Sequence, residues 1–435
     1  MSLVQGKDYL LDQRIPSTPR SLILLALLFV PGVYLVLLLS AILPLGMYFG
    51  IVHQLTQIPS KSGSDQSLER MIGLGAIIAT SACLRGIWMT VFRKTRFELG
   101  LVIDLSREGK LESFISDICN QLGAKLPDAI ILHAEPTFFV QSGKLKVLNA
   151  KIKGRILAIS LPLISGLSLR QLRAVLVHEF AHFTGNDTVY SSVVLPVYVG
   201  TQESMNRLLA EINSTSKDLQ GAIIGFFTKI PLFLPYLVLL LYLKLFQILD
   251  MKLSRLREKR ADVISALICG SGTFSDSLRK VIRLSGSFYS LSYQQIVELL
   301  KDDKAYVNYY NTFRNSLAQS WEWSSRFEVE ALAEKELAFS SHPTLQTRLN
   351  YIPNVPERYN DTEHATSLFI NLESYEKVLT EAYTEYVSLV SHAEIQNSKQ
   401  IKLPNPTRPV ASVKCPNCYM RTYQGTHCHV CGKPL

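Results

Sequence analysis

The chain has 435 residues, 19% of them charged, and a formal net charge of +9 at pH 7. This length allows two or three domains with a sizeable core, and the positive mean hydropathy is typical of chains with membrane segments. A basic balance fits nucleic acid or anionic lipid; the apolar segments described below favour membrane lipid, and nucleic acid is not expected as a partner. Four of the seven cysteines lie close together at the end of the chain, which excludes a disulfide framework and favours a reducing compartment.

The first apolar segment, residues 22–52, carries no charged residue and exceeds the roughly 20 residues needed to span a bilayer. A polar loop, residues 53–70, separates it from a second apolar segment, residues 71–92, which Arg85 interrupts. We expect both segments to cross the membrane, so that residues 1–92 form an N-terminal anchor.

Basic residues follow the second segment directly, at Arg93, Lys94 and Arg96. Such residues favour the cytoplasmic side of a membrane, so two crossings leave the N-terminus and everything after residue 93 in the cytoplasm. The alternative is that the polar start of the chain, with few cations, specifies the orientation only weakly. We expect an integral protein of a bacterial cytoplasmic membrane.

Residues 110–123 show an amphipathic pattern that predicts a helix ending near its glycine. Short β-type runs follow between residues 128 and 160, with a turn-like Ser142-Gly143 pair among them. The last run, residues 155–160, is expected to be an edge strand with which an extended peptide can pair; the alternative is an ordinary buried strand. The candidate substrate-binding residues on this run are Arg155, Leu157 and Ile159.

The motif His178-Glu179-Phe-Ala-His182 lies within an apolar helical run, for which Ser168 is the expected N-terminal cap. Residues four apart share a helix face, so both imidazoles can reach one zinc ion at about 2.0–2.1 Å. Glu179 would lie beside the metal, where it can accept a proton from water. The alternative is a pair of core histidines satisfied by hydrogen bonds, and a third ligand decides between the two.

Two more apolar runs follow, residues 188–200 and 221–249, and the second is broken by Lys229, Pro231 and Pro235. A third ligand beyond residue 249 must lie on the same side of the membrane as His182, so the chain crosses an even number of times between them. Either both runs cross, which we expect, or residues 221–249 re-enter as a hairpin bent at the prolines. The remaining alternative is a buried soluble hairpin.

The third ligand is expected within residues 251–267, whose apolar spacing predicts a helix. Glu258 and Asp262 are four residues apart and share one face. A catalytic zinc site takes three protein ligands and leaves a position open, so Glu258 can complete the set. Asp262 can accept a hydrogen bond from the outer nitrogen of a ligating histidine. The alternative is a surface salt-bridge face, because basic residues, among them Arg255, Lys259 and Arg260, surround these carboxylates.

The joint pattern of His178-Glu-Phe-Ala-His182, a hydrophobic interval and Ser254-Arg-Leu-Arg-Glu258-x-x-Ala261-Asp262 resembles the integral-membrane gluzincins, the metalloprotease family of HtpX and the CAAX prenyl endopeptidases. The resemblance covers residues 20–350. It implies a mainly α membrane protein with an α+β zincin-like catalytic domain, in which a small sheet accompanies the active-site helix. It also implies a zinc endopeptidase that acts on protein or peptide substrates.

A further motif of that family is matched by Ser341-His342-Pro343 followed by Arg348. By resemblance, His342 or Arg348 would stabilise the oxyanion that forms as water attacks the peptide carbonyl. For His342 the alternative is a helix-capping residue before Pro343. The chain departs from the family in its less apolar residues 188–219 and in its long continuation beyond Arg348.

The end of the chain carries two C-x-x-C pairs behind a proline-bearing linker, residues 398–412. Their thiols belong to Cys415, Cys418, Cys428 and Cys431. Four thiolates at this spacing bind zinc tetrahedrally, and a module this small needs the metal to fold. We expect residues 413–435 to form a structural zinc ribbon; the alternatives are free reduced thiols, or a site that uses His427 or His429.

The expected segments, in order, are an anchor (1–92), the first part of a metalloprotease domain (93–187), a membrane-associated helical pair (188–249), the second part of that domain (250–397), the linker (398–412) and the ribbon (413–435). The expected function is that of a membrane-anchored endopeptidase with one catalytic and one structural zinc ion. Its substrates would be membrane or membrane-proximal proteins, in quality control. The alternative is a non-catalytic membrane adaptor that recruits partners through the ribbon, against which Glu179 argues, since a relic needs no base.

Overall fold

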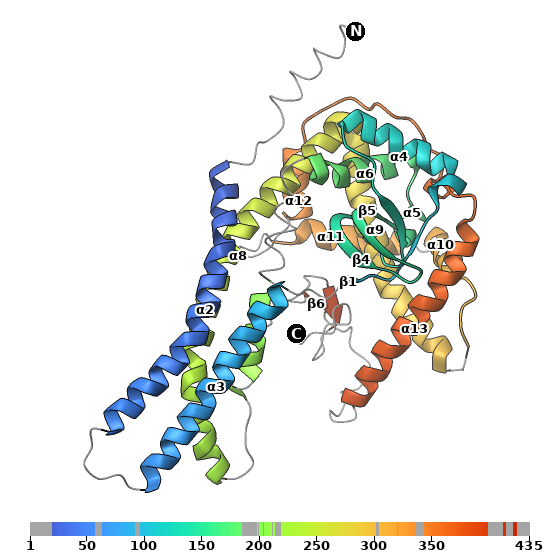
Figure 1. Cartoon of the computed structure of the whole chain (residues 1–435). Coiled ribbons are helices and arrows are strands. Elements are labelled where there is room, and N and C mark those ends of the chain that lie inside the picture. Colours follow the sequence, from blue (N-terminus) through green and yellow to red (C-terminus); the bar gives the residue numbers. More distant parts are fainter. Residues whose placement is uncertain are drawn as a thin grey trace. The chain divides into compact units, whose positions relative to one another are not determined.

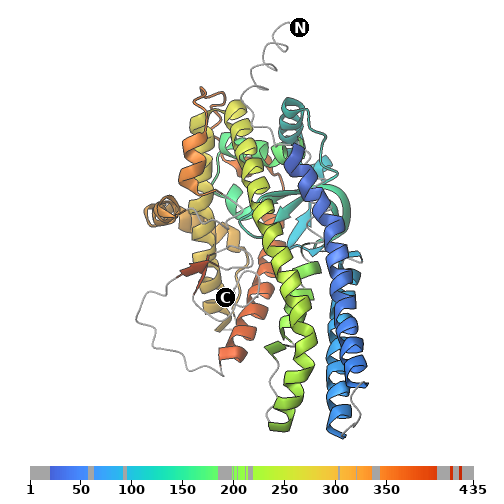
Figure 2. The ribbon, with the colours of Figure 1, turned by 90° about the vertical axis from the view of Figure 1, so that its left-hand side faces the viewer.

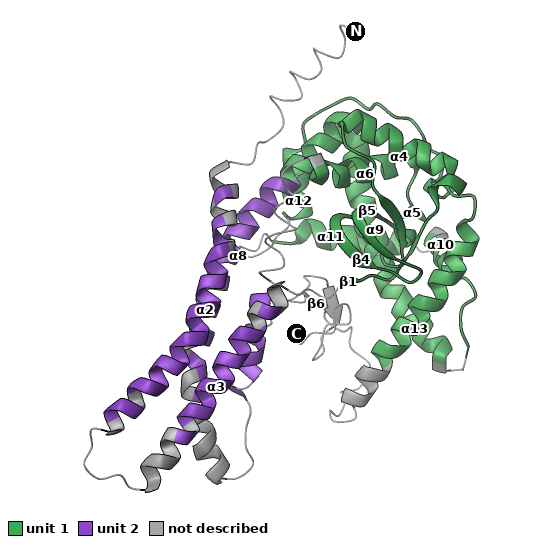
Figure 3. Cartoon of the chain, viewed as in Figure 1, with its two compact units in different colours: residues 1–15, 96–184, 259–435 green, residues 16–95, 185–258 purple. Residues whose placement is uncertain are grey.

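The computed structural model describes residues 20–56, 63–91, 96–184, 198, 200–202, 204–210, 212–213, 219–301, 304–319, 321–335, 343–398, 412–414 and 421–423. Contacts within the chain divide it into two compact units, coloured separately in Figure 3. The sheet unit comprises residues 1–15, 96–184 and 259–435, and the apolar unit comprises residues 16–95 and 185–258.

A five-stranded mixed sheet organises the sheet unit (Figure 1). In spatial order its strands are β1 (Arg96–Phe97), β4 (Phe139–Lys146), β5 (Lys151–Ser160), β3 (Ala129–His133) and β2 (Gly100–Val102). The central strand β5 runs antiparallel to β4 and parallel to β3. Apolar side chains of β5 enter core clusters on both faces of the sheet, which explains the continuous apolar run at its end.

Two expectations about this sheet are wrong. Ser142-Gly143 is not a turn, because it lies inside β4, where Gly143 faces Gly154 across the pair. The turn is formed instead by residues 147–150, closed by a 2.9 Å hydrogen bond from Val147 N to Ala150 O. Residues 155–160 are not an edge strand either, because residues 156–158 pair with β3 on one side and β4 on the other. The alternative of a buried strand is correct.

Helices of the sheet unit share one apolar core with the sheet, among them α4 (Gly109–Leu122), α6 (Leu169–Thr184), α9 (Ser271–Lys301), α10 (Tyr309–Gln319) and α13 (Leu372–Ser398). Helix α4 ends as expected at Gly123, whose φ of 62° is left-handed. The shorter elements are η1 (Leu105–Arg107), α5 (Leu161–Ile164), α11 (Trp321–Ala333), α12 (Leu345–Tyr351) and η2 (Ala365–Leu368). The predicted mainly helical fold with a small sheet is confirmed.

The apolar unit contains α2 (Arg20–Thr56), α3 (Gly63–Val91) and the first part of α8 (Leu219–Cys269). Small and branched residues of all three helices pack together, among them Leu37, Ala79 and Leu239. Within the described residues one stretch, Pro31–Gln54, is long and apolar enough to cross a membrane by length and composition. A shorter apolar stretch, Ile72–Arg85, lies on α3.

Helix α8 covers 51 residues, and in Figure 2 it is drawn as one continuous helix coloured from green to yellow. The alternative of a re-entrant hairpin bent at Pro231 and Pro235 is therefore wrong, because both prolines lie within this continuous helix. The helix predicted over residues 251–267 is its last part. The neighbouring run, residues 188–200, lies almost entirely outside the described residues, and the described residues from 200 to 213 are helical.

Two short strands are described at the end of the chain. β6 (Ser412–Lys414) pairs antiparallel with β7 (Arg421–Tyr423). The four cysteines of the predicted ribbon lie outside the described residues. The ribbon and its zinc therefore stay predictions from cysteine spacing.

Candidate active site

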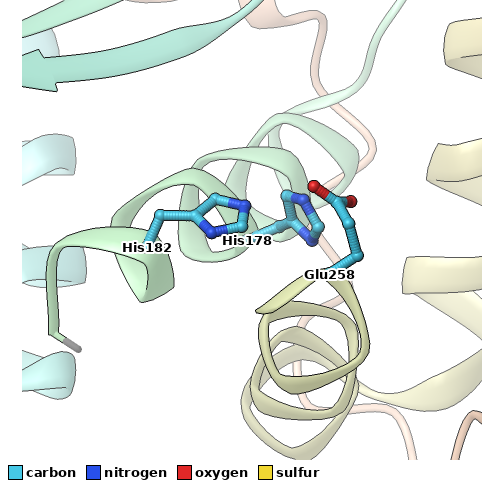
Figure 4. A group of neighbouring side chains, drawn as sticks. All are labelled: His178, His182 and Glu258. Carbon is cyan, nitrogen blue, oxygen red and sulfur yellow. The ribbon is translucent and has the colours of Figure 1, made fainter. Parts of the chain in front are cut away.

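Two histidines and a glutamate converge in the structure, as Figure 4 shows. Each of His178, His182 and Glu258 offers one ligand atom, and these atoms lie within 4.8 Å of one another. The histidines are one turn apart on α6, with ring centroids 5.1 Å apart, and Glu258 lies on α8. Two imidazoles and a carboxylate at this separation are a donor set that suits a divalent zinc ion.

Buried neighbours hold α6 in place. Its apolar face, including Leu176, Val177 and Phe180, is fully buried in the core of the sheet unit. Ser265, in the last part of α8, donates a 2.6 Å hydrogen bond to the carbonyl of Ala174 on α6. This bond fixes the end of α8 against α6 one turn before His178. Because the apolar residues of α6 occupy its buried face, its two histidines lie on the face toward the third candidate metal ligand.

The start of α6 is capped by side chain and backbone. Ser168 precedes the helix as expected, but the contact observed is from its backbone N–H, which donates to Oε1 of Gln171 at 3.0 Å. This is the second half of a capping box. The next two amides, of Leu169 and Arg170, donate to the carbonyls of Glu363 and Asp361. A segment far along the chain thereby accepts from amides that the first helical turn leaves without an intrahelical partner.

Asp262 lies behind the first histidine. Its Oδ1 is 2.9 Å from Nδ1 of His178, so with Nδ1 as the donor, Nε2 of that ring carries the lone pair for a metal. Arg348 of α12 donates to both oxygens of Asp262, at 2.6 and 2.8 Å, and the hydroxyl of Tyr351 donates to Oδ2 at 2.6 Å. The Asp262 side chain is fully buried, and these contacts satisfy both of its oxygens.

This environment sets the charge of Asp262. Burial by itself would raise the pKa of the carboxyl group. The Arg348 guanidinium and the hydrogen bonds from His178 and Arg348 outweigh burial and lower that pKa to about 2. Asp262 is therefore an anion at neutral pH, able to orient His178 and to stabilise positive charge next to it.

The structure places the remaining predicted residues as follows. Glu179 is half-buried on α6, directly after the first histidine. Arg348 contacts Asp262, where the resemblance had suggested an oxyanion partner. His342 lies outside the described residues. Their catalytic roles stay predictions.

The three candidate substrate-binding residues are not exposed along a free strand edge. Leu157 and Ile159 are fully buried in the core. Arg155 is half-buried, and its guanidinium donates to the carbonyl of Leu126 at 2.9 Å. The reason for placing substrate at this strand, an open edge, is therefore removed.

Sequence reasoning missed Tyr351 and the segment that caps α6. Tyr351 lies three residues after Arg348 on α12, so the two share a helix face. That spacing could have indicated a common partner. No local signal links residues 361–363 to a helix that starts so much earlier in the chain, because the bonds involve backbone carbonyls that any residue carries.

Comparisons with known proteins agree on a peptidase family. The model of peptidase family M48 matches residues 106–355. A protease HtpX homolog of Archaeoglobus fulgidus is 25% identical over 268 residues, covering 58% of this chain and 71% of its own length. Protease HtpX of Hahella chejuensis is 26% identical over 229 residues, covering 51% and 74%.

One solved structure, that of S. mikatae Ste24p, aligns at 14% identity with a TM-score of 0.31, covering 71% of this chain and 61% of that chain. This value is too low to guide the description of the fold. The M48 match spans more than half of the chain and includes His178, His182 and Glu258. On that match, the chain belongs to peptidase family M48.

Proposed function

We propose that this chain is a membrane-anchored, zinc-dependent endopeptidase. The observation that carries the proposal is the convergence of His178, His182 and Glu258, with Asp262 held against the first histidine. Two imidazoles, one carboxylate and an outer carboxylate on a ligating ring are the parts of a catalytic zinc site with an open position. Membership of a peptidase family gives this donor set its reaction.

Zinc held by these three residues would supply Lewis acidity, which polarises a peptide carbonyl and lowers the pKa of water toward about 7. Glu179 has the position and chemistry of the general base: it follows His178 on the same helix and is half-buried. Its carboxylate accepts a proton from the attacking water and returns that proton to the departing amine. Asp262 holds His178 in one tautomer throughout.

The open edge of the sheet next to α6 belongs to β4, and we place the substrate there. Helix α6 packs against β4. Among the described residues, the outer side of β4 pairs with β1 only at Leu145 and Lys146. The backbone groups from Phe139 to Gly143 on that side are therefore positioned to pair with an extended peptide.

Membrane anchoring is supported by the apolar unit. Its helices bury a narrow stripe and expose large apolar side chains elsewhere, including Leu35 and Phe49 on α2, Ile77 on α3 and Leu241 on α8. Exposed apolar surface along three packed helices is costly in water and suits lipid. Substrates would then be membrane or membrane-proximal proteins, as in quality control, with the sheet unit in the cytoplasm. A second zinc would be held by the four ribbon cysteines.

The test is hydrolysis of a denatured protein substrate by purified full-length protein in detergent, compared with Glu179→Gln. We expect the variant to keep its zinc and to lose about 10²- to 10⁴-fold in rate, the usual contribution of a positioned acid–base group. Removal of zinc by a chelator should abolish hydrolysis, and added zinc should restore it. Equal rates for the two proteins would contradict the proposal. Full zinc content without hydrolysis by either protein would favour the adaptor.

A further inference from the structure

Four lysines share one face of the β4–β5 hairpin. Lys144 lies directly opposite Lys153, and Lys146 directly opposite Lys151. Directly opposed residues project on the same face of a sheet, and so do residues two apart along a strand. The intervening pair, Leu145 and Ile152, packs into an apolar cluster on the other face. All four lysines are exposed, and we call this surface the lysine face.

Charge repulsion makes the lysine face unfavourable when nothing is bound. Like charges directly opposite each other destabilise a strand pair, and here two such pairs are adjacent. Within the described residues, none of the four lysines makes an ion pair with a carboxylate. An anionic surface would offset this repulsion, because an array of negative groups can face all four ammonium groups on one side of the hairpin.

Apolar side chains border the lysine face. Leu148 lies in the turn at the tip of the hairpin and is 39% exposed. Phe97 is 50% exposed and pairs in register with Lys146, whose ammonium lies 6.0 Å from the centre of its ring. Exposed apolar groups beside basic groups are the combination with which proteins insert at the interface of an anionic membrane. A lipid surface offers anionic headgroups for the lysines and an apolar layer for Leu148 and Phe97 side by side.

The strand that borders the lysine face follows α3 closely in the sequence. Only residues 92–95 separate the end of α3 at Val91 from Arg96, the first residue of β1. Five steps of extended chain span at most about 18 Å. If α3 enters the membrane, this short connection permits Phe97 to reach the headgroups.

We propose that the lysine face, with Leu148 and Phe97, docks the sheet unit onto anionic phospholipid. The inference rests on the membrane anchoring proposed above and adds a second, lipid-selective contact to it. The contact would hold the open edge of β4 close to the bilayer surface, and so close to unfolded or extracted segments of membrane proteins.

The experiment uses full-length protein in nanodiscs, with a polarity-sensitive fluorescent amino acid incorporated at Leu148. Discs of phosphatidylcholine are compared with discs that also contain phosphatidylglycerol. We expect the emission to shift to the blue only in the anionic discs, and the shift to fade as salt shortens the Debye length from about 30 Å at 0.01 M to about 3 Å at 1 M. The same emission in both kinds of disc would overturn the proposal.

A matched pair of variants identifies the lysines. Replacing Lys144, Lys146, Lys151 and Lys153 by Gln should abolish the blue shift. The control replaces four exposed lysines elsewhere on the sheet unit by Gln, namely Lys110, Lys125, Lys304 and Lys335. Both variants lower the formal net charge by four, so a shift lost in both would show a general charge effect and overturn the assignment. A shift produced by a DNA duplex in phosphatidylcholine discs, and not by phosphatidylglycerol, would also overturn it.

Failure of the docking surface and failure of the proposed activity give different results. Glu179→Gln should lose hydrolysis in detergent and keep the full lipid response in nanodiscs. Wild-type protein that hydrolyses substrate but gives no lipid response would remove the docking surface and leave the peptidase. A lipid response together with unchanged hydrolysis by Glu179→Gln would remove the proposed mechanism and leave the docking surface.

Discussion

The side chain of Asp262 connects His178 to Arg348 and Tyr351 of α12. It is fully buried and faces His178 on one side and two donors of α12 on the other. A buried carboxylate needs compensation by charge and hydrogen bonds. Arg348 provides a charge and two hydrogen bonds, whereas Tyr351 provides one hydrogen bond. Both residues can therefore position the His178 ring through Asp262, with Arg348 contributing more.

Arg348→Met should therefore weaken zinc binding and hydrolysis by about 10- to 100-fold, the usual effect of losing an outer partner of a metal ligand. Tyr351→Phe should cost less than about tenfold, because the charge on Arg348 remains. Zinc affinity is measured by competition with a chelating dye, and hydrolysis in the same preparation. As a control, Arg107→Met removes an arginine that is 77% exposed and should change neither. A larger effect of the tyrosine variant would contradict this order.

Two buried thiols should be unreactive. Burial raises the pKa of Cys119 to about 11 and that of Cys269 to about 12, against partial opposition from nearby arginines. The thiolate is the reactive form of cysteine. At pH 8 we therefore expect the alkylation rate of these two thiols to be lower in the folded protein than after unfolding, by a factor on the order of a hundred or more. Reactivity should rise only as pH approaches the raised values. Mass spectrometry of iodoacetamide-treated protein, folded and in urea, measures both rates.

At the scale of elements, the β4–β5 hairpin depends on a pair of glycines. Gly143 and Gly154 face each other with φ of 133° and 127°, values that side-chain-bearing residues rarely adopt. A Cβ at Gly154 would also lie 2.5 Å from Oδ2 of Asp128, whereas a Cβ at Gly143 would meet nothing within 4 Å. The two positions thus separate backbone strain from steric overlap.

Gly143→Ala should lower stability by the cost of strain alone, about 1–3 kcal/mol. Gly154→Ala should cost more, because Asp128 must also move and its oxygen accepts a 2.6 Å hydrogen bond from the amide of Arg155. Thermal unfolding of the detergent-solubilised protein at a fixed scan rate measures the difference. Equal midpoints for both variants would show that the contact with Asp128 is relieved without cost.

Patterns of neighbouring residues correctly predicted the helices whose position and ends depend on those residues. The end of α4 at Gly123 and the helix that carries His178 and His182 follow from apolar periodicity and terminal residues. Metal chemistry requires a third donor, and the helix after residue 250 offers carboxylates; the resemblance to the integral-membrane gluzincins selected Glu258 among them, and its proximity to His178 and His182 agrees with that choice.

Properties set by distant partners were not predictable in this way. A Ser-Gly pair usually marks a turn, but here β4 continues through it, with Gly143 opposite Gly154 of the distant strand β5. The order of strands depends on pairings between distant segments, and β1 and β2 are too short to show a pattern, so the position of β5 was misjudged. The prolines within residues 221–249 suggested a re-entrant hairpin as an alternative to a crossing, but they lie inside the continuous helix α8.

For the whole molecule, the sequence predicts two zinc ions of different function. Full-length protein should contain two zinc ions per chain, and a version ending at Val413 should contain one, because it lacks the four ribbon cysteines. His178→Ala should also reduce the content to one, and the combined change should leave none. Plasma emission spectroscopy on protein of known concentration measures each. An unchanged content after truncation would contradict the ribbon, and an unchanged content in His178→Ala would contradict the catalytic site.

Residues after the family match cap the start of α6, the helix that carries His178 and His182, and this has a consequence for biosynthesis. The amides that begin α6 donate to Asp361 and Glu363, and Ala365 N donates back to Leu167 O, beyond the matched residues 106–355. The ribosome must add the whole stretch of chain from the end of α6 at Thr184 to Ala365 before these bonds can form. At translation rates of about 5–20 residues per second, this takes roughly 10–35 s. During synthesis the nascent chain thus contains both histidines and Glu258 before α6 has its final cap. We therefore expect it to become able to hydrolyse peptides only late in synthesis.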